Sequence, residues 1–242
     1  MRIENWYGGQ MRTFTLDGRR TIVVTPEKAR EGNPWVWRME FFGAFASVDA
    51  DLLKKGFIVA YHSASNMYGC PESIAILGWF QDYMERTYGV SEKPALFGFS
   101  RGGLYAVNYA LTYPDRVGAI YLDAPVLDFR SWPGCGRGYD QEWRDCLACY
   151  HLTEENARMF HQTPLDRAEE LAALRIPLIV VAGESDRVVP VSENLDPFER
   201  RYRNAGGQIA VIRKPSCDHH PHSLTDPSAV SAFLLRALGY QS

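Results

Sequence analysis

Apolar residues along this chain gather in short uninterrupted runs that alternate with amphipathic stretches. The apolar runs cover residues 56–61, 94–99, 117–125, 176–183 and 208–215. Helical periodicity appears near residues 71–88, 101–113, 191–204 and 227–238. Uninterrupted apolar runs are typical of strands whose two faces are both covered by helices. The alternation therefore predicts an α/β fold, a mostly parallel sheet built of βαβ units and flanked by helices.

Two segments depart from this rhythm. Near the N-terminus, strand-like residues flank Asp17-Gly18, a dipeptide favoured in two-residue hairpin turns, which predicts an antiparallel hairpin. Residues 126–174 are rich in glycine, aromatic and charged residues, and we interpret them as a small lid or cap insertion. Such an insertion would lie over the carboxyl ends of the strands, where open α/β sheets bind ligands. Residues 1–242 otherwise read as a single domain.

Composition narrows the possible functions. With 242 residues and 46% hydrophobic content the chain can bury a full core. Its net charge of −3 and the absence of a Lys/Arg block argue against a nucleic-acid partner. No apolar run approaches the roughly 20 residues that span a bilayer, so we expect no membrane span. The first residues lack the apolar core of a secretory signal, which predicts a cytoplasmic protein.

The cysteines do not indicate a disulfide scaffold. They form an odd, sparse set that fits a reducing compartment: Cys70, Cys135, Cys146, Cys149 and Cys217. The Cys146-x-x-Cys149 spacing also occurs in zinc and redox sites, but no second pair and no thioredoxin-like strand accompanies it. We therefore expect two thiols on a helix.

The segment "LFGFSRGG", residues 96–103, carries the strongest chemical signal. An apolar run ends at Phe99 and a helical pattern begins near Arg101, so Ser100 stands on a sharp strand-to-helix turn. The surrounding glycines complete a G-x-S-x-G pattern, the nucleophile elbow of serine hydrolases. The ordinary alternative is a serine that only caps the following helix. The strand and helix on either side favour the nucleophile.

A serine hydroxyl needs a base, and the base needs an orienting carboxylate. Asp186 follows the run at 176–183, and three histidines, His219, His220 and His222, follow the run at 208–215. The order Ser, Asp, His, each just past a strand, is the order found in elbow hydrolases. The sequence thus predicts a catalytic triad.

Alternatives remain at two of these positions. Glu184 or Asp123 could serve as the acid in place of Asp186. The histidines together with Asp218 could instead bind a metal ion, since imidazole and carboxylate are suitable zinc ligands. Adjacent histidines on one loop seldom converge without ligands from elsewhere, so we expect no metal.

The sequence resembles the α/β-hydrolase superfamily from its opening hairpin to its final helix. The segments "NPWVWR", "GFSRGGLYA", "DAPVLDFRSWPG", "GESDRVVP" and "HHPHSL" look like a bacterial group of esterases related to the dienelactone hydrolase and prolyl oligopeptidase branches. The resemblance implies Ser100 as nucleophile, Asp186 as acid and one of the three histidines as base. His219 is favoured, because the superfamily commonly places its histidine about four residues beyond the last strand.

An oxyanion hole needs two donors. One is the amide of the residue after the nucleophile, Arg101. The other comes from the loop after an early strand, which we take to be residues 32–38. Relatives carry a His-Gly motif in this loop and this sequence does not, so no motif identifies the second donor. We choose the amide of Trp37.

Three side chains are candidates for substrate binding: Trp35, Arg38 and Trp132. A tryptophan is as often part of the core. Arg38 could grip a carboxylate or a sugar hydroxyl, or it could form an ion pair with Asp123 or Asp128. The aromatic residues of the insertion, which include Trp132, could stack on sugar rings or form the core of the lid.

These features favour a carboxylesterase that acts through an acyl-enzyme on a small-molecule ester, possibly an acylated carbohydrate, with no dissociable cofactor. One alternative is a peptidase or amidase of the prolyl oligopeptidase type. Another is a non-catalytic binding module that keeps the hydrolase fold, because a fold does not determine a function. The sequence does not indicate the oligomeric state.

Overall fold

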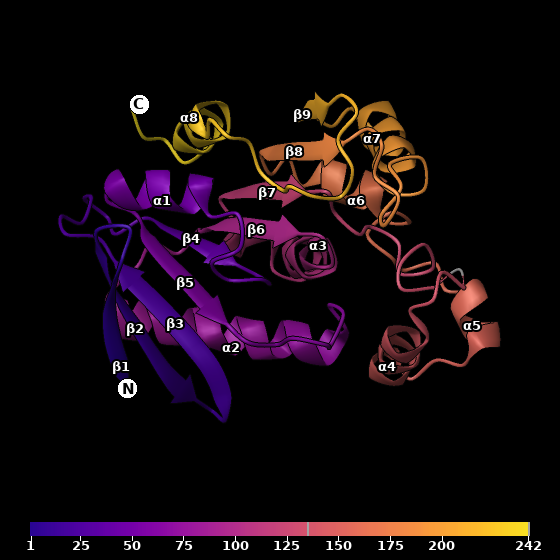
Figure 1. Ribbon diagram of the computed structural model, residues 1–242, viewed down its shortest axis with the longest axis horizontal. Helices are drawn as coiled ribbons and strands as arrows, with labels where there is room; N and C mark the ends of the chain where they lie inside the picture. The colour runs from indigo at the N-terminus through magenta and orange to yellow at the C-terminus, as the bar shows by residue number, and fades with distance from the viewer. Residues whose placement is uncertain (135, 242) are drawn as a thin grey trace.

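The computed structural model describes residues 1–134 and 136–241, so Cys135 and Ser242 lie outside the described residues. One sheet of nine strands runs through the molecule in the order β1-β2-β3-β5-β4-β6-β7-β8-β9 (Figure 1). The pairs β1–β2, β2–β3 and β3–β5 are antiparallel, and every later pair is parallel. The strands are β1 Arg2–Trp6, β2 Gly9–Leu16, β3 Arg19–Thr25, β4 Trp35–Arg38, β5 Ile58–His62, β6 Ala95–Phe99, β7 Ala119–Asp123, β8 Leu178–Gly183 and β9 Ile209–Lys214.

This architecture confirms the predicted mostly parallel sheet with an antiparallel hairpin at its N-terminal edge. The hairpin of β2 and β3 turns at Asp17-Gly18, as predicted, and β1 extends it to three strands. The exposed, charged residues of β1 lack the apolar run by which the other strands were predicted.

Helices cover both faces of the sheet. On one face α1 (Ser47–Lys54) and α8 (Ser228–Ala237) pack on alternate strand residues such as Phe97 and Tyr121. On the other face the residues between them, such as Leu96 and Ile120, meet α2 (Pro71–Tyr88), α3 (Gly102–Thr112), α6 (Ala168–Ala173) and α7 (Leu195–Asn204). A short 3₁₀ helix, Pro114–Arg116, follows α3. Both faces of the central strands are thus buried, which explains their uninterrupted apolar sequence.

The predicted insertion has two structural parts. Helices α4 (Asp140–Tyr150) and α5 (Glu154–Arg158) lie beyond the carboxyl ends of the strands (Figure 1). Helix α6 instead packs against α3 and α7 within the helix layer. Cys146 and Cys149 both lie on α4, as two thiols on one helix, and burial raises the pKa of Cys149 to about 11.

The prediction of a loop at residues 32–38 was wrong for residues 35–38. The segment that we interpreted as a loop contains β4, which pairs with β5 on one side and β6 on the other. A run of only four buried residues, ending in an arginine, is too short for periodicity to separate a strand from a loop. The loop that follows this strand therefore begins at Met39.

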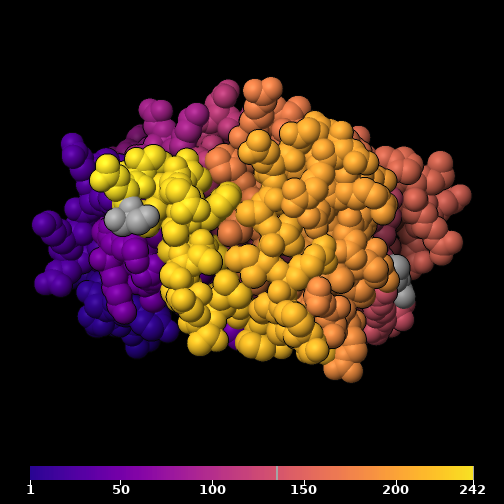
Figure 2. All heavy atoms as spheres, turned by 90° about the horizontal axis from the view of Figure 1, so that it is seen from above, coloured from indigo at the N-terminus to yellow at the C-terminus, as the bar shows by residue number. Residues whose placement is uncertain are grey.

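Among the described residues, no helix is both long enough and apolar enough to cross a membrane. The face shown in Figure 2 is formed in large part by the C-terminal third of the chain, coloured orange to yellow.

Arg38, at the end of β4, is completely buried. Its Nε and Nη2 lie 2.7 and 2.6 Å from the two carboxylate oxygens of Asp49 on α1. Its guanidinium carbon lies 3.8 Å from the centroid of the Phe99 ring on β6. The predicted ion pair exists, but with Asp49 and not with Asp123 or Asp128. It ties α1 to the strands directly beneath the strand-to-helix turn at Ser100.

The Arg38–Asp49 pair predicts a large loss of stability when one partner is neutralised. Asp49→Asn leaves the buried guanidinium without a countercharge, which should lower the free energy of unfolding by about 3 kcal/mol or more. Asp82→Asn is the matched control, because the Arg116–Asp82 pair has side chains 28% and 45% exposed and should cost at most about 1 kcal/mol. Urea unfolding at pH 7 measures both variants, and equal losses would contradict the interpretation.

Candidate active site

Ser100 occupies a strained turn between β6 and α3. Its φ of 48° lies in the left-handed region that residues other than glycine seldom adopt. Its amide donates to the carbonyl of Asp123 over 2.9 Å, and its carbonyl accepts the amides of Val126 at 2.9 Å and Gly103 at 3.0 Å. These bonds hold the serine backbone from both sides, so the strained conformation is maintained by β7 and the loop that follows it.

The three glycines around Ser100 differ in how much space a side chain would find at each position. A Cβ on Gly98 would lie 2.8 Å from the carbonyl oxygen of Gly102, and one on Gly103 would lie 2.7 Å from the carbonyl oxygen of Val126. A Cβ on Gly102 would meet nothing closer than 3.5 Å. Close backbone packing thus requires the first and the third glycine of this turn, but not the second.

His219 links Ser100 to Asp186. The Oγ of Ser100 lies 3.1 Å from Nε2 of His219, and Nδ1 of His219 lies 2.7 Å from Oδ2 of Asp186. The other oxygen of Asp186 accepts the amides of Val188 and Val189 at 2.9 and 2.8 Å. With one oxygen held by its own turn, Asp186 presents the other to the imidazole. The structure therefore brings together all three residues that the sequence selected.

The loops that carry His219 and Asp186 pack tightly against each other. A Cβ on Gly183 at the end of β8 would lie 2.4 Å from the carbonyl oxygen of Cys217, and that oxygen accepts the amide of Ser185 at 2.9 Å. Asp218 accepts the amides of Arg187 and His219 at 2.9 and 2.8 Å. These two amide bonds hold the pKa of Asp218 at about 2.

The alternative acids occupy other environments. Glu184 is exposed, and its amide bonds to the carbonyl of Lys214. Asp123 is fully buried and faces a different histidine, with Oδ1 2.8 Å from Nδ1 of His222. Its Oδ2 accepts the hydroxyl of Tyr121 and the amide of Ser223. Two His–Asp pairs therefore lie side by side, with the rings of His219 and His222 4.7 Å apart between centroids.

An ion pair beside Ser100 was not apparent in the sequence. Nε and Nη2 of Arg101 donate to Oε2 of Glu40 over 3.1 and 2.9 Å. Glu40 is 1% exposed; burial raises the pKa of this carboxyl, and the charge of Arg101 opposes that shift. Glu40 lies in the loop after β4, so the pair joins that loop to the serine turn. The signal for it, an acidic residue just past a strand, becomes visible only once β4 is recognised.

The predicted donor at Trp37 lies in the wrong place. The amide of Met39 donates to the carbonyl of Phe97, and alternate residues of a strand direct their amides to the same side. The amide of Trp37 therefore faces β6 within the sheet, away from the cleft. The amides of Arg101 and Glu40 bond to no carbonyl of the described residues, and a Cβ on Gly102 would lie 3.7 Å from the Glu40 nitrogen.

The predicted substrate-binding side chains are parts of the core. Trp35 and Trp37 are fully buried and stack with ring centroids 5.2 Å apart. The indole of Trp35 donates to the carbonyl of Ser91. Trp132 is 8% exposed and packs on Tyr68 and Tyr139. Because these rings and the paired Arg38 lie under other atoms, they have little or no surface for a substrate.

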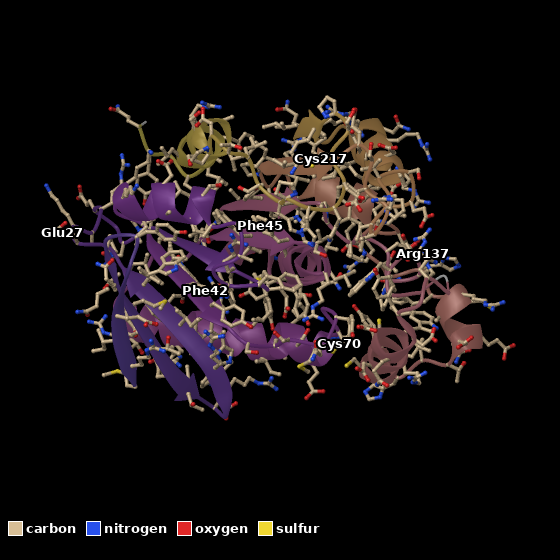
Figure 3. The ribbon with its side chains drawn as sticks, in the orientation of Figure 1. Glu27, Phe42, Phe45, Cys70, Arg137 and Cys217 are labelled. Carbon is tan, nitrogen blue, oxygen red and sulfur yellow. The ribbon has the colours of Figure 1, made fainter. Side chains whose placement is uncertain are left out.

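The loops above the strand ends meet over the site. Figure 3 labels Phe45, on the loop after β4, and Cys217, on the loop after β9. The ring of Phe45 stacks on His220 at 5.5 Å and meets His222 edge-on at 5.3 Å. Aromatic contacts from the early loop therefore cover the histidine loop.

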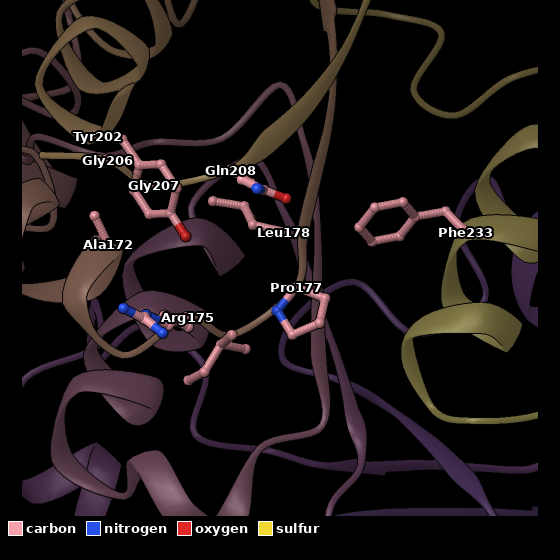
Figure 4. A pocket seen from close by; sticks show the side chains of 10 residues that line it. Ala172, Arg175, Pro177, Leu178, Tyr202, Gly206, Gly207, Gln208 and Phe233 are labelled. Atoms are coloured by element: carbon pink, nitrogen blue, oxygen red, sulfur yellow. The ribbon is translucent and has the colours of Figure 1, made fainter. Parts of the chain in front are cut away.

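A separate cavity of about 490 Å³ lies at the amino ends of β8 and β9, whereas Ser100 follows the carboxyl end of β6 (Figure 4). Its walls come from the segment before β8, the segment before β9, and α7; among the lining residues are Arg175, Pro177, Tyr202 and Gln208. The amino ends of parallel strands lie away from Ser100, so this cavity is not part of the candidate active site.

Comparisons with known proteins agree with this architecture. The family described as alpha/beta hydrolase fold matches residues 69–148. No curated protein matches the chain. An S-formylglutathione hydrolase from Agrobacterium tumefaciens has 17% identity and a TM-score of 0.64, with 98% of this chain and 96% of that chain covered.

Two larger structures resemble the chain over part of their length. A puromycin hydrolase mutant has 18% identity and a TM-score of 0.72, with 96% of this chain and 40% of that chain covered. A puromycin-hydrolyzing peptidase of Mycobacterium tuberculosis has 16% identity and a TM-score of 0.74, with 97% and 40% covered. The chain thus spans about 40% of these two proteins. The chain has the α/β-hydrolase fold, and residues 69–148 match the family of that description.

The two neighbouring glycines after Ser100 predict opposite effects on stability. Gly103→Ala forces a Cβ against the Val126 carbonyl and should lower the free energy of unfolding by about 1–3 kcal/mol. Gly102→Ala has room and lies in a helix, so it should be neutral or stabilising by about 0.5 kcal/mol. Thermal unfolding of the two variants checks the ranking, and a more costly Gly102→Ala would overturn it.

Proposed function

We propose that this protein is a serine hydrolase of carboxylic esters that works through an acyl-enzyme. The observation that carries the proposal is the unbroken series of contacts from Ser100 through His219 to Asp186, on a serine held at positive φ. An isolated helix-capping serine has no need of an imidazole whose other nitrogen meets a buried carboxylate. The arrangement is suited to activating the hydroxyl.

In this mechanism Nε2 of His219 takes the proton of Ser100 as Oγ bonds to the ester carbonyl carbon. The carbonyl electron pair moves to oxygen and then returns, which breaks the bond to the alcohol; His219 gives its proton to that leaving oxygen. Water repeats the sequence on the acyl-enzyme and releases the acid. Asp186 keeps the Nδ1–H tautomer in place and stabilises the imidazolium. No dissociable cofactor takes part in these steps.

For the oxyanion we assign the amide of Arg101 and, in place of Trp37, the amide of Glu40. Both amides are without a carbonyl partner among the described residues and lie beside the serine turn. The Arg101–Glu40 ion pair holds the two loops that carry them at a fixed separation. Donors held in advance are what stabilise a developing oxyanion at low cost.

An ester substrate is preferred over a peptide because of how the chain aligns with its structural neighbours. The chain and the S-formylglutathione hydrolase cover each other almost end to end, whereas the chain corresponds to only 40% of either puromycin-hydrolysing protein. A small-molecule ester, including an acylated carbohydrate, therefore suits this chain best.

The proposed roles of these residues predict large differences in turnover among their variants. Ser100→Ala and His219→Ala should each lower the turnover of p-nitrophenyl butyrate by about 10³-fold or more, and Asp186→Asn by about 10³- to 10⁴-fold. Asp123→Asn should cost far less, because it leaves the contacts of Ser100, His219 and Asp186 in place. Steady-state kinetics on folded variants measures the ranking. Turnover of Ser100→Ala within tenfold of the wild type would refute the assignment.

A substrate panel distinguishes the three function classes. The proposal expects burst release of p-nitrophenol from short acyl esters, cleavage of some acetylated glycan or feruloyl esters, and no cleavage of aminoacyl anilides. Anilide cleavage at rates comparable to esters would identify a peptidase. If a fluorophosphonate does not label Ser100, the site is a binding module with no activated serine.

A further inference from the structure

Three imidazoles converge at the candidate active site. One ring nitrogen from each of His219, His220 and His222 lies within 4.8 Å of the other two. The three rings also contact one another, with centroids 4.7 to 4.9 Å apart. The proposed ester hydrolysis uses His219 as its base and gives the other two histidines no part in the chemistry.

Two of these histidines already have the surroundings of metal ligands. Nδ1 of His219 faces Asp186 over 2.7 Å, and Nδ1 of His222 faces Asp123 over 2.8 Å. A metal-binding histidine commonly donates its second ring N–H to a carboxylate, which fixes the ring and raises its basicity. Each Nε2 is then the nitrogen left to bind a metal. The two buried carboxylates also supply the negative charge that a divalent cation needs.

His220 can serve as the third ligand. Its side chain is exposed, and its ring rests on Phe45, so it can turn without disturbing the core. Two nitrogens on one tetrahedral zinc ion lie about 3.4 Å apart, closer than the 4.8 Å within which one ring nitrogen of each histidine lies here, so the rings have to approach one another on binding.

Asp218, the fourth candidate ligand in the sequence, is engaged elsewhere. Its carboxylate pairs with Arg187 and accepts two backbone amides. Three imidazoles without a carboxylate ligand form a site for a borderline cation such as Zn²⁺, with a fourth position open to water. Mg²⁺ and Ca²⁺, which require oxygen ligands, do not fit this set.

We propose that His219, His220 and His222 form an inhibitory Zn²⁺ site that overlaps the catalytic base. Nε2 of His219 has one lone pair, which cannot both bind the cation and accept the proton of Ser100. Bound Zn²⁺ therefore switches off ester hydrolysis, and its removal restores it. Binding of the cation stands on the histidine cluster alone; only the loss of activity rests on the proposed function.

The experiment separates these two parts. Titration with Co²⁺, a visible-absorbing substitute for Zn²⁺, should give the intense bands of a tetrahedral site in wild type. These bands should be absent in His220→Ala. His161→Ala, which removes an exposed histidine outside the cluster, is the matched control and should titrate like wild type. Equal binding by His220→Ala and wild type would overturn the site whether or not the protein is an esterase.

Kinetics then tests inhibition. Micromolar ZnCl₂ should suppress hydrolysis of p-nitrophenyl butyrate by wild type, and EDTA should restore it. The His220 side chain forms no hydrogen bond or ion pair with the described residues, so His220→Ala should keep its basal rate, with the inhibitory Zn²⁺ concentration raised at least about tenfold. Cys217→Ser controls for thiol binding. The proposal is overturned if Cys217→Ser, and not His220→Ala, removes the sensitivity, or if bound metal leaves the rate unchanged.

Discussion

The arrangement of the candidate active site depends on Asp123, the last residue of β7. Its carbonyl accepts the amide of Ser100, and its carboxylate holds His222 and the amide of Ser223. The two loops that have to meet, one after β6 and one after β9, are thus bound to the same residue. Since Asp123 has no exposed surface, these bonds form away from competing water. Asp123 therefore joins the loop that carries the Ser100 hydroxyl to the loop that carries the His219 imidazole, although these two residues are 119 positions apart in sequence.

Around this anchor, each loop is held by a contact with its neighbour. The turn of Asp186 is bonded to the histidine loop through Ser185 and Cys217, and Gly183 lets the two backbones approach. The early loop joins the serine turn through Glu40 and Arg101. Below them, Arg38 and Asp49 fix the helix on which the early loop ends. Side chains placed in this way lose little further freedom when a substrate binds, which is what rate acceleration by positioning requires.

The sequence predicted those parts of the molecule that depend on local pattern. Each strand with a run of four or more apolar residues was recognised, and Ser100, Asp186 and His219 were selected because they follow such runs. What it could not predict depends on pairs distant in the chain. β4 is too short to have a periodic signature, so Trp35 and Trp37 were placed in a loop and Glu40 was overlooked. The partner of Arg38 was expected among acids at strand ends, whereas it lies on a helix whose first turn shows no clear cap.

The two ends of the predicted insertion are bonded to each other. Arg130, just after the insertion begins, bonds to the carbonyl of Phe160 and to Asp166 near its end. The segment that contains α4 and α5 therefore begins and ends at adjacent points of the fold, because Arg130 bonds the two ends together. A segment with its ends pinned together can be lengthened, shortened or exchanged without altering the register of the sheet. The proposed cap can therefore vary in length and sequence while the residues of the candidate active site keep their positions.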